Sequence, residues 1–287
     1  DAKLDRPNGP EIVIRPPIGK RSEYTSAGYP IASNVLLAGW ETTVMNLIGE
    51  RGDTVTNSGW AWCEATENAG LNVFGNNGSH VDGIYYEIVY RDFAGGYRFG
   101  DRAGIRSDGG SRDKLDSRAT LTIVGSIITG SLTPKTDPND PDWDIHADTL
   151  QVWYANGGKG KITVNDSVVW GSYDKMYNGI GLTLTMNNVY TIAPSYIPGI
   201  YNGPDDVSIL NSNDIYGVVT SGASIVRNST YIGANNPNAQ LQIGNSETYD
   251  LFSYNNYKDL GGNTKLNSIP PPPPTPSHTQ LDSIWSP

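Results

Sequence analysis

Carboxylate, imidazole and aromatic side chains gather in the sequence DPDWDIHADTLQVWY, residues 140–154. Aspartate oxygens are ligands that suit Ca²⁺, and a histidine side chain can take a proton near neutral pH. The spacing therefore predicts a Ca²⁺ site built from Asp142, Asp144 and Asp148. In the scaffold alternative, which stays open, these aspartates are solvated, and His146 and Gln151 bond to turn backbone.

Basic residues gather in a second stretch. Residues 98–118 hold six of the twenty basic residues of the chain, whereas residues 137–148 hold five aspartates and no basic residue. If the strands coil into a β-helix, loops that leave adjacent coils lie side by side, so the basic stretch would face the acidic one. A basic loop that faces an acidic loop suits cleavage of an acidic polysaccharide by elimination. Ca²⁺ and arginine neutralise the uronate carboxylate while a base removes the neighbouring proton.

Residue types assign separate roles within this chemistry. Side chains able to exchange a proton beside a bound uronate are His146, Lys175 and Arg106 as bases, with Tyr177 as proton donor. Aromatic rings that stack on sugars, and arginines that bind carboxylates, would hold the substrate: Trp143, Trp153, Tyr154, Arg102 and Arg112. Hydrolysis by two carboxyl groups is the second option, because Asp144 and Asp148 would share a face if one strand carried both.

Short strands in a repeat would position these residues. The unit is an apolar-x-apolar strand, a polar bend and a second apolar strand, seen at Leu121–Gly130, Ile162–Gly171, Leu182–Thr191, Val207–Gly217, Ala223–Gly233 and from Leu241. An interval of roughly 16 to 25 residues suits one coil of a β-solenoid. Alternation predicts Ile162 and Val164 inside the coil and Thr163 outside it. The Asn and Ser residues after each strand suit tight bends and stacked ladders.

This pattern resembles the right-handed parallel β-helix of the pectate-lyase-like superfamily, which includes polysaccharide lyases and phage tailspikes. His146–Gln151 also resembles the H-x-D-x-x-Q unit of many exported β-helix proteins. The resemblance covers about residues 70–260 and matches no single enzyme family. It implies an all-β fold, an extracellular or virion-surface location, and Ca²⁺ acting with Arg or Lys. An antiparallel sandwich is the rival, but the Asn-Gly steps do not regularly separate paired strands.

The two ends of the chain differ from its centre. We expect an N-terminal arm over residues 1–33, a β-helix domain with its N-terminal cap over 34–267, and a proline-rich tail over 268–287. The cap, a turn or short helix, is expected at Asn34–Gly49. Five consecutive prolines, Pro270–Pro274, predict a stiff polyproline II rod. The rod would be a linker, or would dock on its own helix or on a neighbouring subunit, and subunit docking would build a homo-oligomer or fibre.

Composition limits the partners. A net charge of -10 argues against non-specific nucleic-acid binding, and no apolar run is long enough to span a membrane. A single cysteine, Cys63, excludes an intramolecular disulfide framework, and Asp1 in place of Met predicts a processed chain. The favoured function is an extracellular or virion-associated β-helix that engages a polysaccharide, as a Ca²⁺-dependent lyase. The alternative is a non-catalytic glycan-binding or structural subunit that assembles through its tail.

Overall fold

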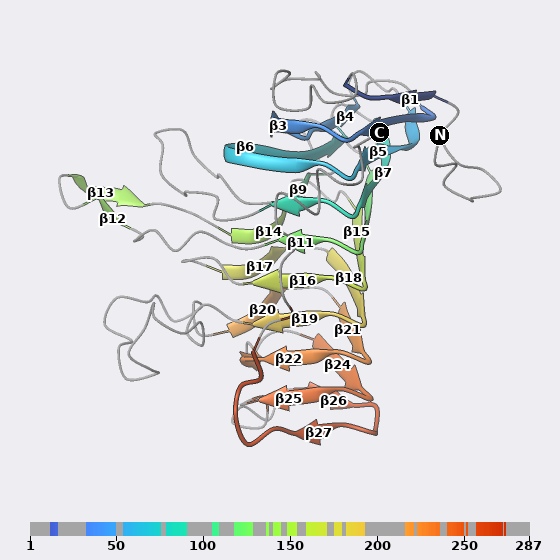
Figure 1. The fold of residues 1–287 in the computed structure, drawn as a ribbon. Helices are drawn as coiled ribbons and strands as arrows, with labels where there is room; N and C mark the ends of the chain where they lie inside the picture. Colours follow the sequence, from blue (N-terminus) through green and yellow to red (C-terminus); the bar gives the residue numbers. More distant parts are fainter. Residues whose placement is uncertain are drawn as a thin grey trace.

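The computed structural model describes residues 12–16, 33–49, 54–75, 79–90, 105–108, 118–128, 136–137, 140–144, 148–153, 159–170, 175–179, 182–192, 216–220, 223–235, 240–249, 251, 257–271 and 273. Within these residues the regular elements are β-strands, and none is an α-helix. The strands stack in long parallel sheets along one axis, as Figure 1 shows. This arrangement is compatible with the predicted parallel β-helix.

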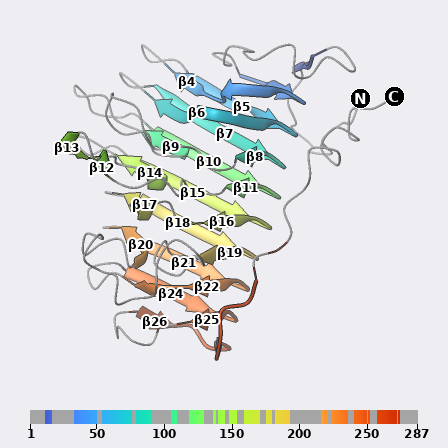
Figure 2. The ribbon, with the colours of Figure 1, turned by 60° about the vertical axis from the view of Figure 1, so that its left-hand side comes forward.

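Sheet A runs the length of the stack (Figure 2). Its ten strands, in spatial order, are β1 (Ile12–Ile14), β2 (Val35–Ala38), β5 (Thr54–Ala61), β7 (His80–Tyr86), β10 (Arg118–Val124), β15 (Lys159–Asn165), β18 (Leu182–Asn187), β21 (Ala223–Arg227), β24 (Gln240–Gly244) and β26 (Tyr257–Asp259). Each strand pairs in parallel with the next. Sheet order follows chain order, so successive coils stack directly on one another.

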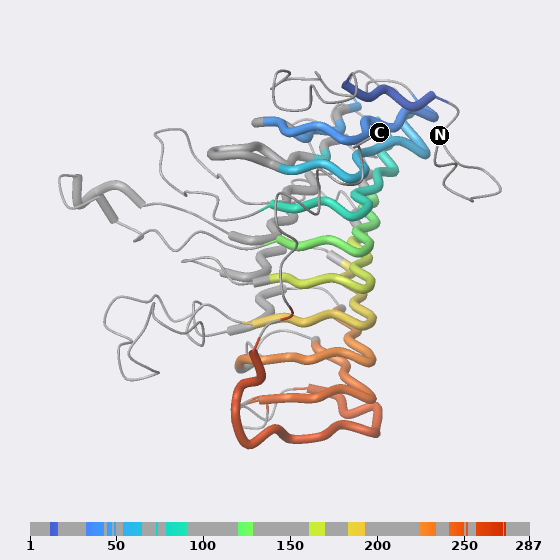
Figure 3. Tube along the Cα trace, in the orientation of Figure 1, coloured from blue at the N-terminus to red at the C-terminus, as the bar shows by residue number. Residues whose placement is uncertain are grey.

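Two further faces complete each coil, and the long strand β6 (Glu64–Gly75) belongs to both. Sheet B contains β3 (Glu41–Val44), β8 (Val89–Tyr90), β11 (Ile127–Ile128), β16 (Val168–Trp170), β19 (Tyr190–Ile192), β22 (Thr230–Ile232), β25 (Glu247–Tyr249) and β27 (Thr264–Lys265). Sheet C contains β4 (Leu47–Gly49), β9 (Ile105–Asp108), β14 (Asp148–Trp153), β17 (Lys175–Gly179), β20 (Tyr216–Thr220) and β23 (Ala234–Asn235). Figure 3 traces the chain through these faces coil by coil.

The predicted repeat units correspond to the passage from sheet A to sheet B. Five of the six fall on such a strand pair, as in β10 with β11 and β15 with β16. The sixth, Val207–Gly217, lies outside the described residues except for its last two, which begin β20 in sheet C. Coil length varies more than predicted, because Thr163 pairs with Thr185 whereas Thr185 pairs with Ile225.

Strand pairing excludes the antiparallel sandwich for the described part of the chain. The pairings of sheets A, B and C are parallel, and the antiparallel pair is β12 (Thr136–Asp137) with β13 (Asp140–Asp144). The segment expected as a cap forms β2, β3 and β4, which is a coil of three strands with no helix. β1, from the expected N-terminal arm, extends sheet A beside β2.

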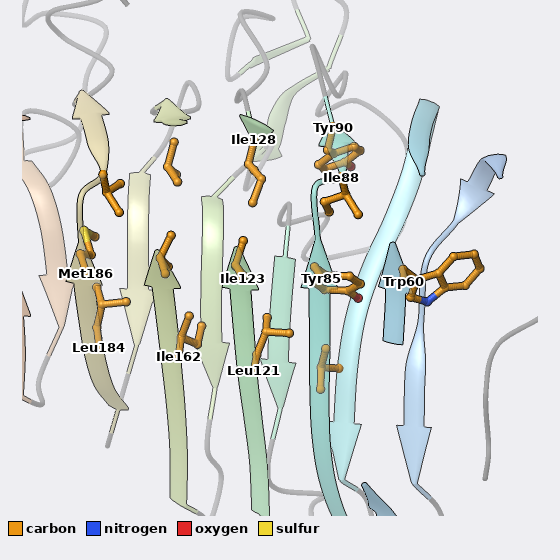
Figure 4. Packing of buried hydrophobic residues seen from close by; sticks show 14 of the residues in the cluster. Trp60, Tyr85, Ile88, Tyr90, Leu121, Ile123, Ile128, Ile162, Leu184 and Met186 are labelled. Carbon is orange, nitrogen blue, oxygen red and sulfur yellow. The ribbon is translucent and has the colours of Figure 1, made fainter. Parts of the chain in front are cut away.

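The core fills the space that the three sheets enclose (Figure 4). Ile162 and Val164 are fully buried while Thr163 between them is partly exposed, which confirms the predicted alternation. Aliphatic pairs stack in successive coils, as with Leu121 on Ile162 and Ile162 on Leu184. The N-terminal coils are filled by larger rings, including Trp60 and Tyr85, which have no exposed surface. Apolar burial of this kind is the main stabilising term of such a fold.

The corner between sheets A and B has the same construction in most coils. A residue with positive φ follows the A strand: Gly39, Trp62, Glu87, Gly125, Asp166, Asn188, Asn228 and Asn245. The next residue is buried. Its side chain often accepts a hydrogen bond from the backbone N–H of the equivalent residue in the coil before. Ser167 Oγ accepts from Ser126 N at 3.0 Å, and Ser126 Oγ accepts from Ile88 N at 3.2 Å. The polar bends were predicted from the sequence. Serine hydroxyls provide much of the ladder of hydrogen bonds that runs along this corner from coil to coil.

Replacing Ser167 with alanine should therefore destabilise the fold. Ser126 N–H is buried and would lose its acceptor, at a cost of about 1 to 3 kcal/mol. Urea unfolding would measure the change in free energy. Thr183→Ala, at an exposed position on the outer face of sheet A, is the control and should change the stability by less than about 0.5 kcal/mol. Equal effects of the two substitutions would contradict the role of the ladder.

The start of the C-terminal tail docks on its own chain. After β27 the chain turns back over the outer face of sheet B, where Ile269 packs against an apolar cluster that includes Tyr190 and Ile192. The Tyr190 hydroxyl donates to the Pro270 carbonyl oxygen at 2.9 Å, and burial raises the pKa of Tyr190 to about 12. Residues 274–287 lie outside the described part, so assembly through the tail stays a prediction.

Candidate functional site

Sheet C brings together residues that are far apart in the sequence. β9, β14 and β17 are neighbours in this sheet, so Arg106, Asp148 and Lys175 come from three successive coils. β9 belongs to the basic stretch 98–118, and β14 begins at the end of the acidic stretch 137–148. The strands β9 and β14 are therefore neighbours, and the expected facing of the basic and acidic loops stays a prediction.

Register places Arg106 in a row of polar residues. Asn72, Arg106 and Gln151 pair in turn across β6, β9 and β14, and Gln151 pairs with Asn178 of β17. Val73, which follows Asn72, is fully buried. Because successive strand positions alternate between the two faces of a sheet, the Asn72 row belongs to the outer face.

A second row lies two residues further along the same strands. Phe74 pairs with Asp108, and Asp108 pairs with Trp153. By the same alternation this row shares the outer face with the Asn72 row. The residues of the two rows thus occupy neighbouring positions of one parallel sheet. We call the two rows together the sheet C surface.

Lys175 pairs directly with Asp148, at the first positions of β17 and β14. Neighbouring strands of a sheet lie about 4.8 Å apart, so the two backbones are adjacent. Tyr177, the expected proton donor, pairs with Leu150 on the same two strands. Tyr177 and Lys175 lie one and three residues before Asn178, so by alternation their positions do not share the face of the Arg106 row. Side chains at these positions are not among those described, and the roles assigned to them stay predictions.

The acidic stretch is divided between two elements. Asp142, Trp143 and Asp144 lie on β13, which forms a separate hairpin with β12, whereas Asp148 opens β14 of sheet C. One strand does not carry both Asp144 and Asp148, because Asp144 ends β13 and Asp148 begins β14. The alternation argument for a hydrolytic pair of carboxyl groups therefore fails.

Several predicted site residues lie outside the described part of the chain: His146, Tyr154, Arg102 and Arg112. Among the side chains that the structure describes, no group of three or more His, Cys, Asp or Glu could hold a metal ion. The side chains of Asp142, Asp144 and Asp148 are not in that set, so the Ca²⁺ site stays a prediction.

Trp60 and Trp62, on or next to β5, have different environments. Trp60 is buried in the core and its Nε1 donates to the Asn46 carbonyl oxygen at 3.2 Å, so it cannot stack on a sugar. Trp62 is partly exposed at the corner between sheets A and B. Its Nε1 donates to Glu87 Oε2 at 2.7 Å, and its ring meets Tyr86 edge-on with centroids 5.7 Å apart.

Sequence reasoning missed Asn72, Phe74, Asp108 and Asn178 as members of the sheet C surface. Their signal is a two-residue spacing that recurs in three strands, as Asn-x-Phe, Arg-x-Asp and Gln-x-Trp. Each tripeptide is too short to be recognised alone. Register between coils is needed to align them.

In the part of the chain that the structure describes, no helix is long and apolar enough to cross a membrane. Comparison of the chain with protein-family models, with curated proteins and with solved structures gives no match.

Proposed function

We propose that the chain is an extracellular or virion-surface polysaccharide-engaging protein, and that the sheet C surface binds an acidic glycan. The observation that carries this proposal is the register of Arg106 between Asn72 and Gln151, with Phe74, Asp108 and Trp153 in the adjoining row. Arginine forms paired hydrogen bonds with carboxylates, amides bond to hydroxyl groups, and an indole ring stacks on a sugar. The resemblance to right-handed β-helices of the pectate-lyase-like superfamily supports the same substrate class.

The proposed reaction is β-elimination. A base, His146, takes the proton beside the uronate carboxylate, and the new carbon–carbon double bond forms as the glycosidic carbon–oxygen bond breaks. Water returns a proton to the leaving oxygen, and Arg106 holds a carboxylate of the glycan. Ca²⁺, held by Asp142 and Asp144, would neutralise the carboxylate of the reacting uronate.

Turnover of polygalacturonate and polyguluronate tests the proposed reaction. Each cleavage creates one unsaturated uronate, whose ultraviolet absorbance reports the rate. We expect an absorbance rise with added Ca²⁺ that a chelator abolishes. No rise on any uronate polymer would remove the lyase activity from the proposal.

Binding of the same polymers tests the surface separately. Arg106→Ala should weaken binding by about 10- to 100-fold, because a hydrogen bond to a charged group contributes roughly 1.5 to 3 kcal/mol. Arg227→Ala, at an exposed position on the outer face of sheet A, is the matched control and should leave the affinity unchanged. Equal losses for both variants would show that general charge, and not the sheet C surface, attracts the polymer.

The alternative is a non-catalytic glycan-binding or structural subunit, such as a spike, fibre or sheath protein. Binding that depends on Arg106 without turnover would favour a glycan-binding subunit. A structural subunit assembled through the tail predicts that removal of residues 268–287 dissociates an oligomer. The Tyr190–Pro270 hydrogen bond favours docking within the chain over assembly for the first part of the tail.

A further inference from the structure

An apolar column runs along the outer face of sheet B. Tyr190, Val168, Ile127 and Val89 pair in turn across four coils. The neighbouring positions Ile128 and Val169 belong to the core, so the column lies on the opposite face. Toward the C-terminus the same column becomes polar, with Thr230, Glu247 and Thr264.

The apolar part of the column is covered. Val168, Ile127 and Val89 are 8%, 7% and 2% exposed. An outward side chain on a single sheet reaches such values when another segment lies over it. At Tyr190 the covering segment is the start of the tail, through Ile269 and Pro270.

The direction of the tail is fixed by its described residues. Thr264 and Lys265 lie in β27, and Pro270 meets Tyr190 of β19, three strands further toward the N-terminal end of sheet B. The segment therefore crosses the coils at a steep angle and enters the apolar column where that column begins. Five prolines follow Ile269, and a polyproline II rod cannot turn back within a few residues.

The period of the rod matches the period of the coils. Three residues of polyproline II complete one turn and advance about 9 Å, which is about the height of two stacked strands. Ile269 packs on sheet B, whereas Pro271 and Pro273 are exposed. A repeat of three therefore puts positions 272 and 275 on the side of Ile269, two and four coils further along.

We propose that the proline-rich tail is a strap that covers the outer face of sheet B from Tyr190 to Val89. Position 272 contacts the column near Ile127, and position 275 lies at the far end of the column, just beyond Val89. Aromatic side chains are the usual partners of polyproline II segments. The occupant of this face is the C-terminal segment of the same chain, and this proposal is independent of the glycan surface on sheet C.

A nitroxide spin label on Ser277→Cys in the full-length chain tests the strap. Cys63 is buried and would not take the label. The strap predicts an immobilised spectrum, because position 277 follows the last docked residue closely. Ile127→Ser and Val89→Ser should each produce the sharp spectrum of a mobile tail. Ile225→Ser, an equivalent change on the outer face of sheet A, should leave the spectrum immobilised.

Tyr190→Phe supplies a milder variant if Ile127→Ser fails to fold, and it should raise the mobile fraction by loss of the hydrogen bond to Pro270. A mobile label in the unmodified background, or an immobilised label in all variants, would overturn the strap. A spectrum that sharpens on dilution would overturn it too, since the occupant would then be the tail of a second copy. Glycan binding by sheet C is expected to be unchanged in each variant.

Discussion

Replacing His146 with alanine should lower the rate of uronate cleavage by about 10²- to 10⁴-fold, the usual contribution of a general base. His146 is favoured over Lys175, because the Lys175 position has the parity of Leu150 and Tyr177 and lies on the face of sheet C opposite to the Arg106 row. A histidine side chain can take up a proton near neutral pH. The ultraviolet absorbance of the unsaturated product measures the rate, and binding of the polymer should persist.

His80→Ala is the matched control, because His80 is a partly exposed histidine on the outer face of sheet A. It should leave both rate and binding unchanged. A large loss of rate in Lys175→Ala with a small loss in His146→Ala would contradict the assignment of His146 as the base. Loss of binding in His146→Ala would instead make His146 a substrate contact.

Replacing Gly59 with alanine should destabilise the N-terminal coils by about 3 kcal/mol or more, at the upper end of the effect of overpacking. A Cβ atom on Gly59 would collide with the carbonyl oxygen of Ile84 on the adjacent strand β7 and lie 2.7 Å from Ile84 Cγ2. Backbone cannot give way as a side chain can, so β5 and β7 would have to separate. In a stack of coils this separation is expected to unfold the coils on the N-terminal side first.

Gly83→Ala provides the comparison within the same pair of strands. Its Cβ would approach the end of the flexible Leu47 side chain, at 2.5 Å from Cδ1, and a rotamer change can relieve that contact. We expect a loss of about 1 kcal/mol. Urea unfolding of the two variants measures the difference, and equal losses would show that the β5–β7 backbone approach is not limiting.

Much of the fold could be predicted because core positions alternate with polar positions in each short strand. Ile162 and Val164 with Thr163 between them is one such pattern, and the bend at Asp166–Ser167 follows it directly. Coil lengths could not be predicted, since the insertions between Thr122 and Thr163 and between Thr185 and Ile225 leave no periodic signal. Register between sheet C strands depends on those lengths.

Prediction of the candidate site from the sequence was limited by the same unknown register. Arg106, Asp148 and Lys175 were expected to lie near one another, and their strands β9, β14 and β17 are neighbours in sheet C. The parity that separates Lys175 from Arg106, and the neighbours of Arg106 in its row, could not be assigned without the register. The spacing of Asp142, Asp144 and Asp148 also does not reveal that β13 and β14 are separate strands.

Oxidative footprinting of tryptophan with and without polygalacturonate tests the sheet C surface most directly. Hydroxyl radicals modify exposed indole rings, and a bound polymer shields the rings beneath it. The proposed function predicts that polygalacturonate protects Trp153 on β14 and leaves Trp62, at the corner of sheets A and B, as reactive as before. Protection of Trp62 without Trp153, or protection of neither, would contradict it.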